Sequence, residues 1–267
     1  MFITTCAGGW LKESGEEKFA AAAKLGFKAV EILDWTKLDF DKAKAEIEKN
    51  GCALSAILIK SRDSHKQSLI ANEHGIVHED ALNAFVDSIG ETLEAAKAME
   101  CKNIVVTTGN ERSDVPRQVQ HDNVVKALKA ASEVVAGSGV TLVLEPLNIL
   151  VDHKGYYLTT TSEGVEIIKK VGSPQVKLLY DVYHQQITEG NLINNIRDNI
   201  EHIGHIHVGD VPGRKEPGTG EIHYKNVFKA IAETGYDKYV VFECGLTEDV
   251  ETVCNKMWEL MPFECYV

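Results

Sequence analysis

At residues 202–224 the sequence reads HIGHIHVGDVPGRKEPGTGEIHY, a short apolar strand pattern that leads into a polar loop. Residues 203–208 have the alternation and β-branched content of a strand. His205 and His207 are two positions apart, so both side chains point to the same face of that strand. The loop carries Arg214 and is too rich in Gly and Pro for a core segment. A strand that delivers a histidine into such a loop is typical of a binding site, although a satisfied core pair of histidines is the alternative.

The rest of the chain repeats this strand pattern, each time followed by a helical one. Strands are expected at residues 2–6, 28–33, 53–59, 103–108, 140–145, 176–181, 202–208 and 238–243. Helices are expected at residues 16–25, 39–50, 79–99, 119–136, 161–171, 191–199, 224–234 and 248–260. Strands that alternate with helices predict a parallel sheet, and about eight such units predict a closed (β/α)₈ TIM barrel. An open doubly wound sheet is the competitor, but no Gly-x-Gly-x-x-Gly motif follows the first strand. We therefore expect a single α/β TIM-barrel domain over residues 1–267.

Composition restricts the classes of protein to which the chain can belong. Its 267 residues are 44% hydrophobic and 25% charged, as in ordinary globular proteins. No apolar run approaches the roughly 20 residues that cross a bilayer, and no signal-peptide pattern begins the chain. Six cysteines without a CxxC pair fit a reducing cytoplasm. A net charge of −12 argues against a nucleic-acid partner. The sequence allows a homo-oligomer, and the long polar connection at residues 60–78 could be a lid, an extra helix or a subunit contact.

Four side chains of metal-binding type stand where strands of the second half end. LVLEP carries Glu145, KLLYD ends in Asp181, GHIHVGD carries His207 and YVVFEC carries Glu243. A TIM barrel gathers the carboxyl ends of its strands at one rim, so these side chains should meet there. A carboxylate that closes a buried strand is costly unless it is paired or bound to a metal ion, and a structural salt-bridge cluster is the alternative. Three carboxylates and one imidazole suit one divalent ion, Mn²⁺ or Mg²⁺, and Co²⁺ could substitute.

Other polar residues are expected beside this cluster. His184 follows Asp181 by three positions, so both could face the same mouth, or His184 could be a surface loop residue. Arg214 offers a fixed fork of donors for a substrate oxygen or carboxylate, with a solvated loop charge as the alternative. Glu221 is expected to hold its loop through backbone donors. Cys244 should lie on the opposite side of its strand as a small buried hydrophobe.

Several segments of the second half resemble the xylose isomerase-like barrel superfamily, and within it hydroxypyruvate isomerase. They are LEPLN at 144–148, GYYLTT at 155–160, YDVYHQQITEG at 180–190, GHIHVGDVPGRKEPGTGEIHY at 204–224 and FE at 242–243. The first half resembles the family in its strand–helix rhythm and in KLGFKAVEIL at 24–33.

The resemblance implies roles for individual residues. It implies that a divalent metal is held by residues Glu145, Asp181, His207 and Glu243. Glu145 and Glu243 would also be the acid–base pair, and His184 and Arg214 would contact substrate oxygens. Position 207 is His, where hydroxypyruvate isomerases tend to carry Gln and ketose 3-epimerases tend to carry His.

We expect a metal-dependent isomerase that interconverts a small sugar or hydroxy-acid substrate, such as hydroxypyruvate, through a cis-enediolate. A ketose 3-epimerase is the alternative, and His207 supports it. An apurinic-site endonuclease would need histidines on early strands, which end here in ILIK and VVTTGN. A non-catalytic sugar-binding or scaffold protein is the remaining alternative.

Overall fold

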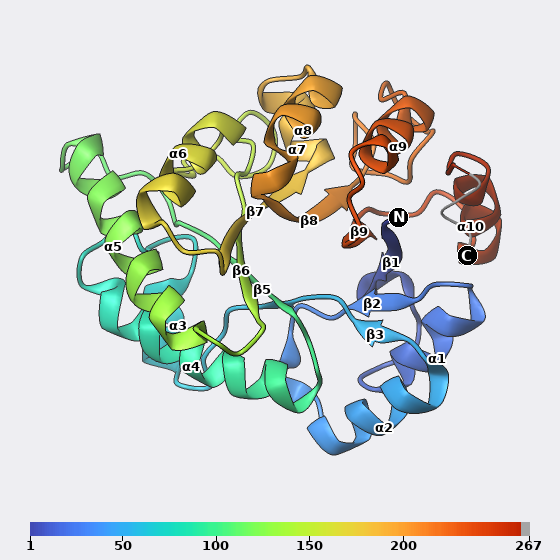
Figure 1. Cartoon of the computed structure of the whole chain (residues 1–267), viewed down its shortest axis with the longest axis horizontal. Coiled ribbons are helices and arrows are strands. Elements are labelled where there is room, and N and C mark those ends of the chain that lie inside the picture. Colours follow the sequence, from blue (N-terminus) through green and yellow to red (C-terminus); the bar gives the residue numbers. More distant parts are fainter. Residues whose placement is uncertain (263–267) are drawn as a thin grey trace.

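The computed structural model describes residues 1–262, so Cys265 lies outside the described residues. Its strands form one parallel sheet in the order β3-β2-β1-β9-β8-β7-β6-β5-β4, with the helices around the outside (Figure 1). The expected TIM barrel is therefore confirmed. The strands are β1 Ile3–Ala7, β2 Ala29–Glu31, β3 Ala53–Leu54, β4 Ile57–Leu58, β5 Asn103–Val106, β6 Thr141–Leu144, β7 Val176–Asp181, β8 Ile203–Val208 and β9 Tyr239–Phe242.

The third expected strand, at residues 53–59, is divided into two short strands. Its first part, β3, pairs with β2, and its second part, β4, pairs with β5. Between them, Ser55 accepts a hydrogen bond at its carbonyl oxygen from Nδ2 of Asn103 at 2.8 Å. The backbone N–H of Leu58 also donates to the carbonyl oxygen of Leu33 at 3.1 Å. The chain itself thus connects the two ends of the sheet and closes the barrel.

Ten α-helices are described, and two of them lie outside the eight helical ranges expected from the sequence. They are α1 Glu17–Lys24, α2 Phe40–Asn50, α3 Ser64–Ile70, α4 Ala81–Ala98, α5 Arg117–Val135, α6 Thr161–Val171, α7 Val182–Thr188, α8 Leu192–Asn199, α9 Tyr224–Glu233 and α10 Val250–Trp258. Helix α3 is the extra helix that the connection at residues 60–78 allowed, and α7 was not expected. Helix α3 is capped at its N-terminus by Asp63, whose carboxylate accepts from the backbone N–H groups of His65 and Lys66. It packs on α4, where Lys66 pairs with Asp87 at 2.8 Å, so the polar connection forms part of the helical layer.

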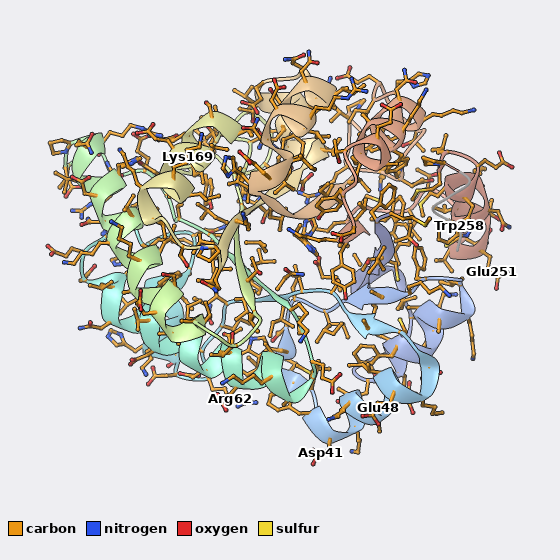
Figure 2. The ribbon with its side chains drawn as sticks, in the orientation of Figure 1. Asp41, Glu48, Arg62, Lys169, Glu251 and Trp258 are labelled. Carbon is orange, nitrogen blue, oxygen red and sulfur yellow. The ribbon has the colours of Figure 1, made fainter. Side chains whose placement is uncertain are left out.

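Apolar side chains fill the space between the strands and the outer helices. Phe2 and Trp35 are buried in this core. Trp10 packs against Phe242 and donates from Nε1 to the carbonyl oxygen of Cys244 at 2.7 Å. Charged side chains such as Glu48 lie at the periphery (Figure 2). Within residues 1–262, no helix is long and apolar enough to cross a membrane.

Candidate functional site

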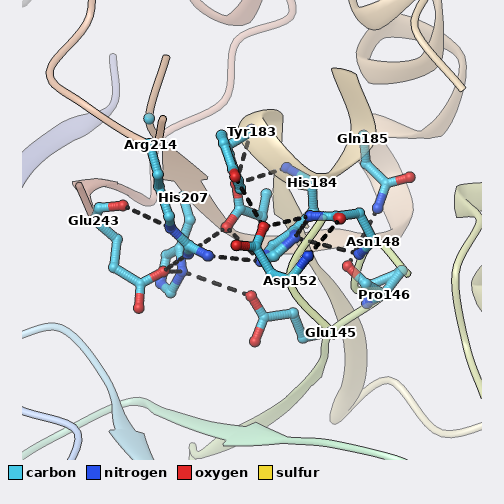
Figure 3. A network of polar contacts seen from close by, with 12 residues as sticks. Glu145, Pro146, Asn148, Asp152, Tyr183, His184, Gln185, His207, Arg214 and Glu243 are labelled. Atoms are coloured by element: carbon cyan, nitrogen blue, oxygen red, sulfur yellow. Dashed lines mark hydrogen bonds and ion pairs between the residues drawn. The ribbon is translucent and has the colours of Figure 1, made fainter. Parts of the chain in front are cut away.

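The four expected ligand residues meet at the carboxyl ends of the second-half strands. Three of them, Glu145, His207 and Glu243, are labelled in Figure 3. Ligand atoms of Glu145, Asp181, His207 and Glu243 all lie within 4.8 Å of one another. Strand register produces this meeting, because Asp181 is paired with His207 across β7 and β8. Asp181, His207 and Glu145 are buried, whereas Glu243 is partly exposed. The arrangement is a small polar chamber with one open side.

His207 provides the test of whether this group fits a metal ion. Its Nδ1 lies 2.8 Å from Oε2 of Glu243 and 3.8 Å from Oε1 of Glu145. Nevertheless, this nitrogen has no hydrogen-bond partner of suitable geometry among the described residues. A buried nitrogen without a partner that faces carboxylate oxygens is a donor set that suits a divalent cation. The residues present therefore fit such an ion.

The two glutamates of the chamber have opposite surroundings. The pKa of Glu145 is raised to about 8, chiefly by burial. The carboxylates of Glu243 and Asp181 also raise this pKa, whereas His207 and Arg214 act to lower it. Burial also acts to raise the pKa of Glu243, but the charges of His207 and Arg214 outweigh it and lower that pKa. Two carboxyl groups whose pKa values are moved apart in this way are suited to opposite roles in proton transfer.

Arg214 reaches the chamber from the loop after β8. Its Nη2 donates to Oδ2 of Asp181 at 3.0 Å and to Oε2 of Glu243 at 2.5 Å. The guanidinium lies over the ring of Tyr183, with 5.0 Å from Cζ to the ring centroid. The hydroxyl of Tyr183 in turn donates to Asp152 at 2.8 Å. Arg214 is thus held at the chamber, where its donors are close to any anion that enters.

His184 lies on helix α7 and is completely buried, so the alternative of a surface loop residue is wrong. The helix begins there because Oδ1 of Asp181 accepts from the backbone N–H groups of Tyr183 and His184. Nε2 of His184 lies 2.8 Å from Nη1 of Arg214, and Nδ1 accepts from the backbone N–H of Asn148 at 3.2 Å. Burial lowers the pKa of His184 to about 4, so the ring is neutral.

A different carboxylate from the expected one holds the loop between β8 and α9. Asp210 is fully buried and accepts from the backbone N–H groups of Val211, Gly218, Gly220 and Ile222 at 2.8–3.1 Å. Gly220 passes so close that an added Cβ would lie 2.1 Å from the carbonyl oxygen of Val211. Glu221 is exposed and its carboxylate accepts from Gln186, so the expectation that it holds the loop is wrong.

Cys244 also differs from its expectation. Strand β9 ends at Phe242, so Cys244 is one residue beyond Glu243 in a loop and is only partly buried. It lines an open cavity of about 560 Å³ that adjoins the chamber at Arg214 and Glu243. The cavity is also lined by Lys18 and Lys37. Within residues 1–262, neither lysine has a carboxylate at ion-pairing distance.

Three further residues that contact the site, Glu31, Asn148 and Asp152, were not predicted from the sequence. Glu31 ends β2 and is buried, and its Oε2 lies 2.9 Å from Nε2 of His205 and 3.1 Å from Nε2 of His207. The signal was present in KLGFKAVEIL, where a carboxylate closes an apolar strand as in the second half. Asn148 contacts His184, and Asp152 accepts a hydrogen bond from Tyr183. Both lie in a loop whose shape no local sequence pattern predicts.

The chain belongs to the xylose isomerase-like TIM barrel family, because the family model of that description matches residues 19–254. It is 32% identical over 225 residues to the 2-oxo-tetronate isomerase of Cupriavidus necator, and the matched region covers 84% of each chain. It is 30% identical over 242 residues to the hydroxypyruvate isomerase of Escherichia coli, and the matched region covers 90% of this chain and 91% of that one. The expectation of an isomerase-class enzyme is thereby confirmed at the level of the family.

Solved structures show the same fold. The structure of an AP endonuclease, family 2, from Brucella melitensis has a TM-score of 0.87 at 24% identity and covers 98% of this chain and 100% of that one. Ketose 3-epimerases, including an L-ribulose 3-epimerase, share the fold as well. At these identities the likeness concerns the fold alone.

Proposed function

We propose that the protein is a divalent-metal-dependent isomerase that interconverts a small hydroxy-carbonyl acid of the hydroxypyruvate type. The observation that carries this proposal is the convergence of Glu145, Asp181, His207 and Glu243 within 4.8 Å, with Nδ1 of His207 facing the carboxylates and making no hydrogen bond of suitable geometry. The two relatives named hydroxypyruvate isomerase and 2-oxo-tetronate isomerase support the same class of substrate.

The chain's own residues supply the proton transfers. A bound Mn²⁺ or Mg²⁺, held by the four converging residues, would polarise the carbonyl and the adjacent hydroxyl of the substrate. One of Glu145 and Glu243 takes the proton from the carbon beside the carbonyl, and the other returns one to the former carbonyl carbon. The carbon skeleton passes through a cis-enediolate. In the net reaction, one hydrogen moves between neighbouring carbons and one hydroxyl hydrogen moves between their oxygens.

Charged groups around the cavity favour an acid over a neutral sugar. Arg214 stands at the chamber, and Lys18 and Lys37 line the adjoining space without carboxylate partners in residues 1–262. A substrate carboxylate would gain charge-assisted hydrogen bonds from these donors. His184 beside Arg214 would contact a substrate oxygen.

The direct test is an assay with defined metal content. Protein treated with EDTA and reconstituted with Mn²⁺, Mg²⁺ or Co²⁺ is given hydroxypyruvate, and formation of tartronate semialdehyde is followed. We expect turnover that disappears with EDTA and returns with the metal. Undiminished turnover after complete metal removal, or no turnover of any hydroxy-carbonyl acid with any of the three ions, would contradict the proposal.

A ketose 3-epimerase is the second candidate, and His207 is the observation that favours it. In that reaction the two glutamates would act from opposite faces of one carbon. A panel of neutral ketoses assayed beside hydroxypyruvate separates the two functions, because an epimerase changes the configuration at C3 and leaves the carbonyl in place. An apurinic-site endonuclease is not supported, since β4 and β5 lead into Lys60 and Thr107 rather than histidines.

A further inference from the structure

The first histidine of the GHIH motif has no part in the chemistry above, yet it is completely buried in the barrel. His205 and His207 project from the same face of β8 toward Glu31. Glu31 reaches them from β2, which is separated from β8 by β1 and β9 in the sheet. A single oxygen, Oε2, lies 2.9 Å from Nε2 of His205 and 3.1 Å from Nε2 of His207. This contact connects the two halves of the barrel directly beneath the chamber.

The hydrogen-bond chemistry of this contact determines how His207 presents its ring. An ionised carboxylate only accepts hydrogen bonds, so the two imidazoles that share Oε2 both direct an Nε2–H group toward it. For His207, this leaves Nδ1 as the nitrogen that faces Glu145 and Glu243. A metal-binding histidine commonly has its other ring N–H fixed by a carboxylate, which sets the tautomer and the ring orientation.

We propose that Glu31 is a positioning residue that fixes the ring of His207 with Nε2 protonated and Nδ1 directed at the metal-binding carboxylates. His205 is the second donor, which holds Oε2 of Glu31 in place from the side away from the chamber. This inference rests on the proposed metal-dependent function. The polar contacts of Glu31 are with the two histidines, and its nearly buried carboxylate lies at the edge of the cavity.

Nitrogen NMR tests the protonation of His207 without any substitution at Glu31. The intact protein is labelled with ¹⁵N-histidine and studied with and without Mg²⁺, and His207→Asn and His205→Asn variants assign the signals. We expect Nε2 of His207 to carry a hydrogen in both states and Nδ1 to be the nitrogen whose shift changes on addition of Mg²⁺. An Nε2 without a hydrogen, or a change on Mg²⁺ addition at Nε2 rather than Nδ1, would overturn the proposal.

Metal affinity tests the consequence of this positioning. Glu31→Gln preserves size but can present an amide N–H to His207, which favours the wrong ring nitrogen. We expect the dissociation constant for Mn²⁺, measured by electron paramagnetic resonance, to rise about 10–100-fold. Asp34→Asn is the matched control, an acid-to-amide change just beyond the same strand that makes no contact with His207, and it should leave the constant unchanged.

The outcomes separate this inference from the proposed function. If the wild-type protein does not bind Mn²⁺, the metal-dependent function itself is wrong. If the wild type binds Mn²⁺ and Glu31→Gln binds it equally well, the positioning role is wrong and the proposed function stands. If Glu31→Gln does not fold, the NMR measurement on the wild-type protein decides the question.

Discussion

Glu145 and Glu243 carry the same carboxyl group in different electrostatic settings. Glu145 is buried among other carboxylates, whereas Glu243 is partly exposed and contacts His207 and Arg214. The pKa of Glu145 is raised to about 8 by its burial, and that of Glu243 is lowered by its contacts with His207 and Arg214. The difference arises from placement on neighbouring strands rather than from the residue type.

Replacement of either glutamate by glutamine tests the acid–base assignment. Glu145→Gln and Glu243→Gln each remove a group that transfers a proton, and we expect kcat to fall by about 10²–10⁴-fold. Assays are run with saturating Mn²⁺, so that weaker metal binding does not cause the loss. Glu48→Gln, an exposed change on α2, should keep the wild-type rate. Near-wild-type rates in both site variants would show that the assignment is wrong.

Lys18 should distinguish acidic from neutral substrates. Its ammonium group donates to the carbonyl oxygen of Gly8 and lines the cavity beside the chamber. A hydrogen bond between charged groups contributes about 1.5–3 kcal/mol, so Lys18→Met should raise KM for hydroxypyruvate by about tenfold or more. A neutral ketose that is turned over should show no such change. Lys12→Met, an exposed lysine nearby in sequence, is the control, and an equal loss for acidic and neutral substrates would contradict the prediction.

At the scale of the element, the loop after β8 is built around one buried carboxylate. Asp210 binds four backbone N–H groups of the loop, and Arg214 extends from this loop into the chamber. The hydroxyl of Tyr224 at the start of α9 also donates to the carbonyl oxygen of Gly209. The position of Arg214 therefore depends on contacts that are made inside the loop and not at the substrate.

Asp210→Ala should loosen this loop and weaken substrate binding. Each buried donor left without a partner costs about 1–3 kcal/mol, but the loop can admit water, so we expect a loss of about 2–4 kcal/mol in the free energy of unfolding. KM should rise more than kcat falls, since Arg214 is displaced while the glutamates remain. Asp210→Asn keeps one acceptor oxygen and should lie between the alanine variant and the wild type. Urea unfolding and steady-state kinetics measure both effects, and a wild-type KM in the alanine variant would contradict the prediction.

The elements differ in how well the sequence predicts them. The strands are indicated by apolar runs that alternate with polar residues or are continuous. In a barrel, the carboxyl ends of the strands meet at one rim, so the sequence already predicts that Glu145, Asp181, His207 and Glu243 lie together. Helix α7 was missed because its start depends on Asp181, a residue already interpreted as the end of a strand. The sequence KLGFKAVEIL does show a carboxylate at the end of a strand, but the partners of Glu31 lie three strands away in the sheet, and no local pattern predicts those contacts. Long-range side-chain contacts therefore required the structure.

At the scale of the whole molecule, the barrel closes in two different ways. On one side, β9 pairs with both β1 and β8. On the other side, the continuous chain between β3 and β4 spans the break, with Asn103 bonded to Ser55 across it. The second closure has fewer ladder hydrogen bonds, so the side-chain contact of Asn103 has a larger share in it.

Asn103→Ala should weaken this closure. The change leaves the buried carbonyl oxygen of Ser55 without its 2.8 Å hydrogen bond, and we expect a loss of about 1–3 kcal/mol in the free energy of unfolding. The control is Asn194→Ala, which removes an exposed hydrogen bond to Asn191 and should change stability by no more than about 0.5 kcal/mol. Denaturant unfolding of the two variants measures the difference, and equal stabilities would contradict the role assigned to Asn103.

The position of β9 has a consequence for the chain as it leaves the ribosome. Until residues 239–242 emerge, one side of β1 and one side of β8 have no neighbouring strand, although both strands have already been synthesised. Such edges expose unpaired peptide groups that attract other strands, including those of nearby nascent chains. Translation that pauses before β9 would therefore prolong the stage at which the protein is most prone to aggregate.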